Sequence, residues 1–397
     1  MPDVPGRPQA SPLVRRLRPF TTTIFAEMTE LSERLGAVNL GQGFPDSDGP
    51  PAMLRAARDA IAAGVNQYPP GPGSADLRAA IAEARLRDHG QELDPSDEVL
   101  VTVGATEAVA AAMIALCEPG DEVILVEPYY DSYPAAVAMA GARHLSVPLR
   151  PGPDGRLGLD AAELAAAVTD RTRLVLLNTP HNPTGTVLTR AELEAVAAVC
   201  RERDLLVVTD EVYERLVYDG ERHVPMATLP GMAERTLTIS SAGKTFSATG
   251  WKIGWACGPA PLVAAVRAAK QFITYVGGAP FQPAVAHALR HESAWVAGLR
   301  AELAAARDRL SEGLRAAGLA VRPARAAYFA LADIRPLGLS DGMAFCRELP
   351  ARAGVAAIPV EVFCDRPAEW SHLVRFAFCK RAAVIDEAVA RLEGLSG

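Results

Sequence analysis

From about residue 98 onward, short apolar runs alternate with longer segments that have the period of a helix. The first three runs, each with the helical segment after it, are EVLVTV (98–103) and TEAVAAAMIALC, DEVILVEP (121–128) and YYDSYPAAVAMAG, and RLVLLNTP (173–180) and RAELEAVAAVCRERD. Three further runs follow at 205–213, 236–244 and 253–259. Apolar runs separated by helices are typical of a mostly parallel sheet that is covered on both faces. The alternation therefore predicts an α/β domain.

The pattern changes after Pro283. A long amphipathic helix is predicted over 295–318, and it is followed by strands at 328–334, 355–360 and 373–379 and by a closing helix at 383–395. A chain of 397 residues also exceeds the size at which a single hydrophobic core stops growing. We therefore expect a large domain with a seven-stranded, mostly parallel sheet at 45–285, a smaller α+β domain at 286–397, and an N-terminal arm at 1–44 that joins the small domain.

The composition is that of an ordinary soluble enzyme, with 22% charged residues and a net charge of −7. The basic run Arg15, Arg16 and Arg18 is short and has prolines on both sides, so it is interpreted as a solvated arm and no nucleic-acid partner is expected. The N-terminus lacks the apolar core of a signal peptide, and no run approaches the roughly 18 apolar residues of a membrane span. We expect a cytoplasmic protein without a membrane partner.

The six cysteines are widely scattered along the chain. There is no CxxC pair, and no histidines stand at metal-ligand spacing. In a cytoplasmic chain of this length, buried free thiols are expected in place of disulfides. No metal site is predicted.

Lysine is rare in this chain. Of 40 basic residues only four are lysines, and two of them, Lys244 and Lys252, stand in SSAGKTFSATGWKIGW at 240–255. Arginine stays protonated, so a reaction that needs a neutral primary amine requires lysine, which can form a Schiff base. Chance clustering is the alternative explanation, and the stretch alone does not decide between the two.

Ligands of open parallel sheets bind beyond the carboxyl ends of the strands, so polar residues at those ends are candidate site residues. GATEA at 104–108 offers either a phosphate cradle at a helix start or a glycine that merely makes the turn. Asn182 in NTPHNPTG is a turn residue or a ligand contact, and Asp210 is a helix N-cap or the partner of a ligand cation. Ser241 and Lys244 follow the next run. Pyridoxal 5′-phosphate is the cofactor that requires a phosphate cradle, an acid, hydrogen-bond donors and an amine together.

Seven separated motifs carry a resemblance to a known family. In chain order they are VNLGQGFPD, NQYPPGPG, VTVGATEA, NTPHNPTG, TDEVY, SAGKTFSATGWKIGW and VRFAFCK. Together they span essentially the whole chain, and they resemble the class I/II, fold-type I pyridoxal-phosphate aminotransferases. The resemblance implies that Lys244 forms the internal aldimine with pyridoxal 5′-phosphate and that Lys252 pairs with the phosphate.

The resemblance also implies the roles of the other site residues. Asp210 would pair with the pyridine nitrogen, Asn182 and Tyr213 would bind the phenolic oxygen, and Tyr130 would stack on the ring. The phosphate would lie against the backbone of Ala105 and Thr106, the hydroxyl of Ser241, and Tyr68 of a second subunit in a homodimer. The substrate carboxylate would bind Arg375, Gly43 and Asn182. At position 252 this chain has a lysine where the aspartate-specific members have an arginine. In this respect it resembles the kynurenine, glutamine and methionine aminotransferase branch.

The implied reaction is ping-pong transamination between an amino-acid donor and a 2-oxo acid acceptor, with Lys244 as general base. Within the branch, phrases such as GVNQYPPGPGSADLR and AAKQFITYVGGAPFQPAVA are most similar to the N-succinyldiaminopimelate aminotransferases of lysine biosynthesis, which use 2-oxoglutarate. Gly277 and Gly278 would leave a wide mouth for the succinylated substrate, although a plain turn also explains them. Lys270 is a weak candidate for the succinyl carboxylate, because a lysine on a helix surface is normally solvated.

Other interpretations remain open at this stage. The first is a broad-specificity glutamine, methionine or kynurenine aminotransferase with β-lyase activity on cysteine conjugates. A carbon–carbon or carbon–sulfur lyase on the same fold is a second. A non-catalytic, cofactor-sensing regulator is the most remote, because the arm of about forty residues before GQGFPD is too short for a DNA-binding module and a linker.

Overall fold

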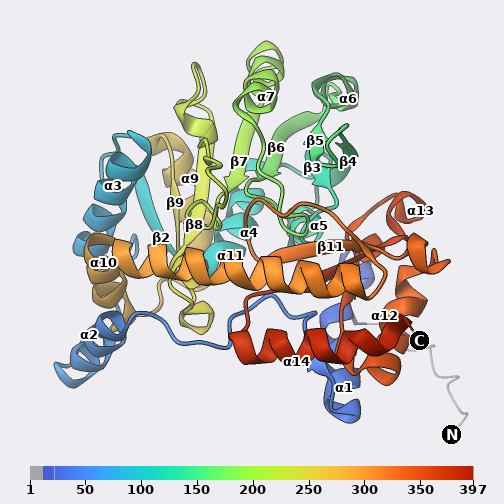
Figure 1. Cartoon of the computed structure of the whole chain (residues 1–397). Helices are drawn as coiled ribbons and strands as arrows, with labels where there is room; N and C mark the ends of the chain where they lie inside the picture. Colours follow the sequence, from blue (N-terminus) through green and yellow to red (C-terminus); the bar gives the residue numbers. More distant parts are fainter. Residues whose placement is uncertain (1–11, 22, 397) are drawn as a thin grey trace, which may run out of the picture.

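The computed structural model describes residues 12–21 and 23–396 and contains a large sheet flanked by helices (Figure 1). In these residues the large sheet has eight strands in the order β2-β9-β8-β7-β6-β3-β4-β5. Their bounds are β2 Val99–Val103, β3 Glu122–Glu127, β4 Arg143–Pro151, β5 Leu157–Leu159, β6 Thr172–Asn178, β7 Leu206–Asp210, β8 Thr236–Ser241 and β9 Ile253–Cys257. The central strands β4, β3, β6, β7 and β8 pair in parallel. The predicted α/β fold is confirmed.

The expected strand number of seven was one too low. The six apolar runs named above omit two strands of this sheet, β4 and β5, and β5 pairs antiparallel with the end of β4. The chain reverses through PGPDGR, where Gly152 donates its N–H to the carbonyl of Arg156 at 2.7 Å. Because only three residues of β5 pair, its LGL sequence carries too little periodicity to be recognised as a strand.

Strand β9 sets which residues share one edge of the sheet. It runs antiparallel to both neighbours, β8 and β2. The carboxyl ends of β2, β6, β7 and β8 therefore lie at the same edge as the start of β9, where Lys252 stands. This edge collects the residues that the motifs singled out.

Helices cover both faces of the sheet, as the apolar strands require. One face packs against α4 Gly104–Leu116, α5 Ser132–Ala140 and α9 Ala260–Lys270. The other face packs against α7 Arg190–Glu202 and, toward β2 and β9, against α2 Pro51–Ala62, α3 Ala75–His89 and α10 Phe281–His291. The remaining short helices around this sheet are η1 Arg15–Phe20, α6 Ala161–Ala167, η2 Met226–Thr228, α8 Ala242–Thr245 and η3 Thr249–Trp251.

A second, antiparallel sheet is built from the C-terminal part, in the order β10-β11-β14-β13. Its strands are β10 Ala320–Val321, β11 Phe329–Asp333, β13 Ile358–Pro359 and β14 Leu373–Ala377. Around it lie α11 Ser293–Ala316, η4 Arg335–Leu337, α12 Gly342–Ala353, η5 Val360–Phe363, α13 Pro367–Trp370, α14 Ala382–Leu392 and η6 Glu393–Ser396. The predicted long helix is α11, which crosses the front of the molecule above α14 (Figure 1).

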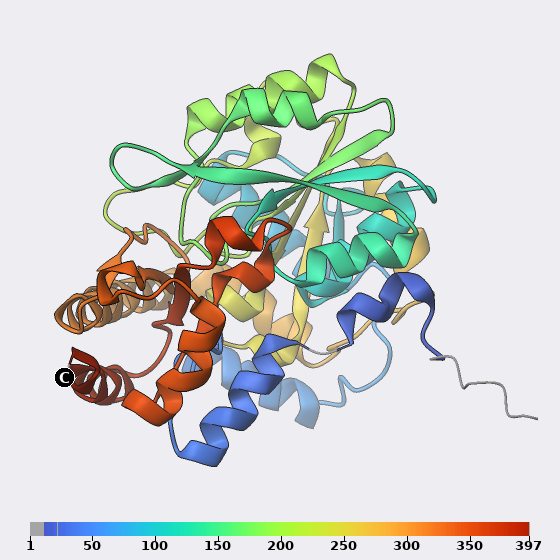
Figure 2. The same ribbon diagram turned by 90° about the vertical axis from the view of Figure 1, so that its right-hand side faces the viewer.

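The N-terminal residues join this second part. Helix α1 (Ile24–Leu35) packs near α12, and β1 (Val38–Asn39) pairs in parallel with β12 (Val355–Ala356). Figure 2 shows α1 beside the C-terminal helices and below the large sheet, whereas η1 lies against α5. The exact domain boundaries stay a prediction, because one hydrophobic cluster joins Tyr213 of the large sheet's edge to Phe329 of the small sheet.

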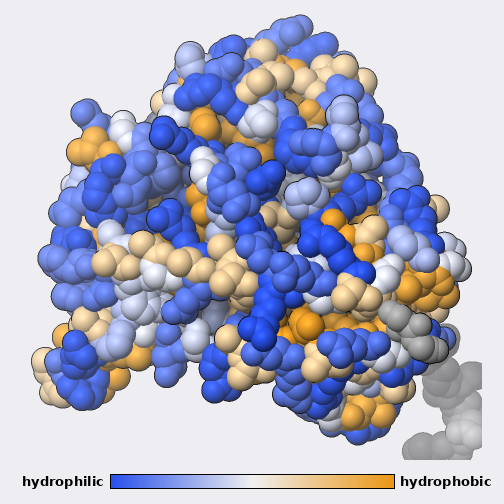
Figure 3. All heavy atoms as spheres, viewed as in Figure 1, coloured by the Kyte–Doolittle hydropathy of each residue, from blue (hydrophilic) through white to orange (hydrophobic). Residues whose placement is uncertain are grey.

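The surface in the view of Figure 3 is mostly hydrophilic, and hydrophobic atoms gather between α11 and α14. A cavity of about 1030 Å³ lies there and reaches Lys244 from the side of the C-terminal helices. Within the described residues, no helix combines the length and the apolar character that crossing a membrane requires.

Candidate active site

A cavity of about 300 Å³ lies where the carboxyl edge of the large sheet meets the second sheet. Eleven of the twelve predicted site residues line it: Gly43, Ala105, Thr106, Tyr130, Asn182, Asp210, Tyr213, Ser241, Lys244, Lys252 and Arg375. The exception is Tyr68. Residues that are far apart in the sequence are thus brought together by the order of the strands.

Lys244 lies in the short helix α8, directly after β8. Its Nζ is 5.6 Å from the ring centre of Tyr328 and 5.8 Å from that of Tyr213. Burial lowers the pKa of the Lys244 amine; the neighbouring Cys379 and Asp210 oppose this shift, whereas the charges of Arg375 and Lys252 reinforce it. The amine is therefore more readily neutral, and hence nucleophilic, than an exposed lysine.

Asp210 ends β7 and is only 5% exposed. Its Oδ2 accepts a hydrogen bond from the hydroxyl of Tyr133 at 2.9 Å, and its Oδ1 accepts one from the N–H of Val212 at 3.2 Å. Burial raises the pKa of the Asp210 carboxyl to about 6, although both hydrogen bonds lower it. The chain continues after Asp210 into a turn and not a helix, so the interpretation of Asp210 as a helix N-cap is wrong. The carboxylate of Asp210 faces the cavity.

An anion cradle forms at the start of α4. Gly104 adopts a φ of +75°, and a Cβ there would lie 3.2 Å from Nζ of Lys252. The glycine thus makes the turn and also lets the lysine approach the helix start. The N–H groups of the first turn of a helix have no partner within the helix and attract anions. With Ser241 and Lys252 beside it, this end of the cavity is suited to a phosphate group.

Arg375 lies on β14 and is 1% exposed. Its Nη1 donates to Oδ1 of Asn182 at 2.9 Å, and its Nη2 donates to the carbonyl of Gly41 at 2.8 Å. Its Nε has no hydrogen-bond partner among the described residues. Burial lowers the pKa of the guanidinium to about 10, so it remains charged at neutral pH. A buried cation with a free donor is suited to a carboxylate ligand.

Aromatic rings enclose this guanidinium. Its carbon lies 4.3 Å from the ring centre of Phe329, 5.2 Å from that of Phe25 and 5.3 Å from that of Phe363. Cation–π contacts hold the group in place and keep water away from it. The sequence analysis missed all three rings, because each is one apolar residue within an apolar or irregular segment.

Tyr133 and Asn178 are further site residues that the sequence analysis missed. Besides the bond of Tyr133 to Asp210, Asn178 accepts the N–H of Asn182 at 2.7 Å and donates to the carbonyl of Asp210 at 2.9 Å. It therefore fixes the two predicted ligands relative to each other. Asn178 is the first residue of the NTPHNPTG motif, and this position could have identified it as a site residue from the sequence.

Tyr68 lies outside the cavity of its own chain. It is 81% exposed, and its ring packs edge-on against Tyr275 with 5.7 Å between the ring centres. Lys270 is not the solvated helix-surface lysine that we expected. It is 1% exposed, and its Nζ donates to the carbonyl of Gly71 at 3.0 Å and to that of Tyr275. It joins two loops and is not available to a substrate carboxylate in this cavity.

The two glycines at 277 and 278 have packing reasons of their own. Gly278 has a φ of +65°, and a Cβ there would lie 2.3 Å from Cδ1 of Ile253; a Cβ on Gly277 would lie 3.0 Å from Cγ2 of Val103. Neither glycine lines the cavity of its own chain. The turn interpretation is therefore the better supported, and the glycines are not evidence for a wide substrate mouth.

Comparisons with known proteins agree with this geometry. The family model described as aminotransferase class I and II matches residues 36–392. The chain is 61% identical to the probable N-succinyldiaminopimelate aminotransferase DapC of Mycobacterium tuberculosis, over 96% of this chain and 98% of that protein. It is 39% identical to the methionine aminotransferase of Escherichia coli, over 96% of this chain and 97% of that protein.

A solved structure is similar over nearly the full length. The N-succinyldiaminopimelate aminotransferase from Mycobacterium tuberculosis superimposes with a TM-score of 0.95 at 62% identity, and the match covers 96% of this chain and all of that one. Fold and sequence thus point to the same group of proteins.

Proposed function

Because this chain belongs to the aminotransferase class I and II family, which depends on pyridoxal phosphate, we propose that it transfers the amino group of N-succinyl-LL-diaminopimelate to 2-oxoglutarate, which becomes glutamate, and catalyses the reverse reaction in lysine biosynthesis. The assignment of this substrate rests on the 61% identity to the mycobacterial relative over 96% of the chain. The chemistry itself is supported by the cavity, which brings an amine, a carboxylate, an anion cradle and a guanidinium together.

The residues of the cavity fit pyridoxal phosphate. When bound, this cofactor supplies an aldehyde that links to a primary amine and a protonated ring that withdraws electrons from the substrate's α-carbon. The cradle at Ala105 and Thr106, with Ser241 and Lys252, would hold its phosphate. Asp210, which faces the cavity, would pair with the ring nitrogen and keep it protonated. Asn182 and Tyr213 would bind the phenolic oxygen, and Tyr130 would stack on the ring.

The substrate's α-carboxylate would bind Arg375, with Asn182 and Gly43 beside it. The free Nε of Arg375 supplies the missing hydrogen-bond donor, and the surrounding phenyl rings exclude water. This contact would orient the amino acid with its α-carbon toward Lys244.

Lys244 would carry the proton. Burial lowers the pKa of this amine, which favours its neutral form, so Nζ would accept the proton from the substrate's α-carbon. Water would release the first product as a keto acid, and a second keto acid would then enter the same site and take the amino group. This order of binding is ping-pong, and it requires one carboxylate site to serve both substrates.

We further propose a homodimer, in which Tyr68 completes the phosphate site of a second copy. Exposed apolar side chains gather near Tyr68 at one end of the molecule: Phe272 is 85% exposed, Ile273 48% and Tyr275 45%. Lys270 holds the loops of Gly71 and Tyr275 together beneath them. The free thiols of all six cysteines fit a reducing compartment, and we place the enzyme in the cytoplasm.

A charge in this exposed group is expected to dissociate the dimer. Phe272→Glu should give a monomer by sedimentation velocity at concentrations where the native protein is a dimer, because burying a carboxylate in an apolar contact is costly. The cofactor should also bind more weakly when Tyr68 is no longer supplied. Leu35→Glu on α1, at a side chain that is 43% exposed, is the control and should leave the dimer intact. A dimeric Phe272→Glu protein would place the interface elsewhere.

The substrate is tested by half-reactions of the cofactor-loaded enzyme. Mixed separately with N-succinyl-LL-diaminopimelate and with glutamate, the enzyme should lose its visible absorbance rapidly. Methionine, glutamine and kynurenine should act more slowly. Rapid loss with these three, and none with the succinylated compound, would support the alternative of a broad-specificity aminotransferase, which the 39% identity to the methionine enzyme favours.

A further inference from the structure

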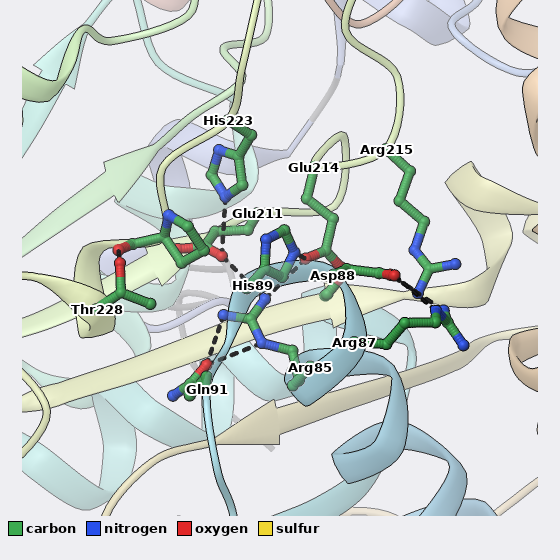
Figure 4. Close-up of polar contacts among 12 residues, drawn as sticks. Arg85, Arg87, Asp88, His89, Gln91, Glu211, Glu214, Arg215, His223 and Thr228 are labelled. Carbon is green, nitrogen blue, oxygen red and sulfur yellow. Dashed lines mark hydrogen bonds and ion pairs between the residues drawn. The ribbon is translucent and has the colours of Figure 1, made fainter.

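A buried ionic cluster lies between the end of α3 and the turn that follows β7 (Figure 4). We call it the Arg85 cluster; it consists of Arg85, His89, Glu211, Glu214 and His223. Arg85 is 3% exposed, Glu214 is 6% exposed and Glu211 is fully buried. None of these residues lines the cavity. Charged groups are seldom buried so deeply without a structural or functional reason.

Arg85 joins the cluster to helix α3. Its Nη1 lies 3.2 Å from Oε2 of Glu211 and 2.7 Å from Oε2 of Glu214. The other side of the guanidinium donates to Oε1 of Gln91, from Nε at 2.9 Å and from Nη2 at 2.7 Å. One planar group thus fixes both glutamates against the end of α3, which a lysine, with its single ammonium, would do less well.

Both glutamates make further contacts besides those with Arg85. Oε1 of Glu214 accepts the hydroxyl of Ser240 at 2.7 Å, and its Oε2 lies 2.8 Å from Nε2 of His89. Oε2 of Glu211 lies 3.0 Å from Nε2 of His223. Burial raises the pKa of each carboxyl, but the neighbouring positive groups outweigh it and hold both pKa values below the usual range. Both glutamates are therefore ionised.

The cluster has ligand atoms that could hold a metal, since one atom each from Glu211, Glu214 and His223 lie within 4.8 Å of one another. However, Nη1 of Arg85 already contacts both carboxylates. The position of a cation is thus taken by the chain's own guanidinium.

Neighbouring residues of the same turn face opposite ways. Asp210 and Tyr213 line the cavity, whereas Glu211 and Glu214 point to Arg85. Glu214 also binds Ser240, which directly precedes Ser241 of the cradle. We propose that Arg85 is a positioning residue that acts through Glu211 and Glu214 to hold Asp210 and Tyr213 against the cofactor. This inference rests on the proposed function of the same cavity.

The test replaces the charge pair without leaving an unpaired carboxylate. In the double variant Arg85→Met/Glu214→Gln, Glu211 keeps His223, and a neutral amide takes the place of the second carboxylate, so the fold is expected to survive. With the turn no longer fixed, kcat should fall about tenfold to a hundredfold, as expected for a small misplacement of reacting groups. KM should change little, because Arg375 is untouched. Arg85→Lys should give an intermediate kcat.

A second readout separates positioning from stability. If the Tyr213 hydroxyl moves, the phenolic oxygen of the cofactor loses a donor, so the pH midpoint of the visible absorbance should rise in the double variant. Arg290→Met is the matched control. Arg290 pairs with Asp76 and Glu83 on the exposed side of the same helix, and its loss should leave the midpoint and kcat native.

The outcomes are distinguishable. A double variant with native kcat and a native midpoint, even if it melts at lower temperature, would refute the positioning role and leave the proposed function intact. A native enzyme that no amino acid bleaches would instead refute the proposed function. If the double variant fails to fold, Arg85→Lys provides the same comparison: an unchanged midpoint and kcat would overturn the inference.

Discussion

Replacing Lys244 with alanine is expected to lower turnover by roughly a hundredfold to ten-thousandfold, the range that a positioned general base contributes. The variant should also bind the cofactor without a covalent link. Borohydride, which reduces a carbon–nitrogen double bond, should fix the cofactor to residue 244 in the native protein, as measured by mass spectrometry of peptides. It should fix nothing at that position in the variant.

Lys244→Arg is the matched variant. It keeps a positive charge between the rings of Tyr213 and Tyr328, yet arginine does not offer a neutral amine at any accessible pH. Both variants should therefore be equally inactive. If Lys244→Arg kept substantial turnover, the charge at this position would matter and the amine would not, which would contradict the proposed mechanism.

Replacing Asp210 with asparagine is expected to have opposite effects on activity and on stability. With no carboxylate to keep the ring nitrogen protonated, kcat should fall roughly a hundredfold to a thousandfold, the usual loss on removing one preorganised electrostatic contact. In the cofactor-free protein, by contrast, the same change removes a buried charge that lacks a cationic partner in direct contact among the described residues. That protein should become more stable at neutral pH.

The pH dependence of this gain in stability follows from the direction in which burial shifts the pKa of Asp210. The pKa of Asp210 rises from 3.8 to about 6 on burial. A carboxyl with a raised pKa in the folded state reduces stability above that pKa and does not affect it below the pKa of the unfolded chain. The gain from Asp210→Asn should therefore be near zero at about pH 4 and should grow to at most about 3 kcal/mol above about pH 6.

Urea unfolding of both cofactor-free proteins across this pH range measures the gain. The difference between the two free energies of unfolding is the quantity to compare, because the other carboxyls titrate alike in both. If this difference does not vary with pH, burial does not destabilise the ionised form of the Asp210 carboxyl. Adding the cofactor should reverse the order of stability, since only Asp210 can pair with a protonated ring nitrogen.

Part of this site could be predicted for a physical reason, whereas Gly43, Tyr130 and Arg375 were named only through the family resemblance. Asn182, Asp210 and Lys244 each follow an apolar strand, and strand ends can be recognised in a single sequence. The rings around Arg375 could not be predicted in the same way. Phe25 and Phe329 come from different elements, and their positions follow only from how the second sheet packs against the first.

The errors have the same origin. Lys270 was expected to be solvated because a helix period says which face a residue lies on, but not what covers that face. Gly277 and Gly278 were interpreted through a substrate, whereas their contacts with Val103 and Ile253 already account for them. Arg85 gave no signal at all, because its two glutamates lie more than a hundred residues away in the chain.

The bond between Arg375 and Gly41 joins residues that are 334 positions apart. During synthesis, the pocket around Arg375 therefore cannot form until β14 has left the ribosome. The cofactor-binding edge of the large sheet is complete much earlier, once β9 has emerged. A nascent chain that folds from its N-terminus can thus present a cradle for the cofactor before it can recognise any amino acid.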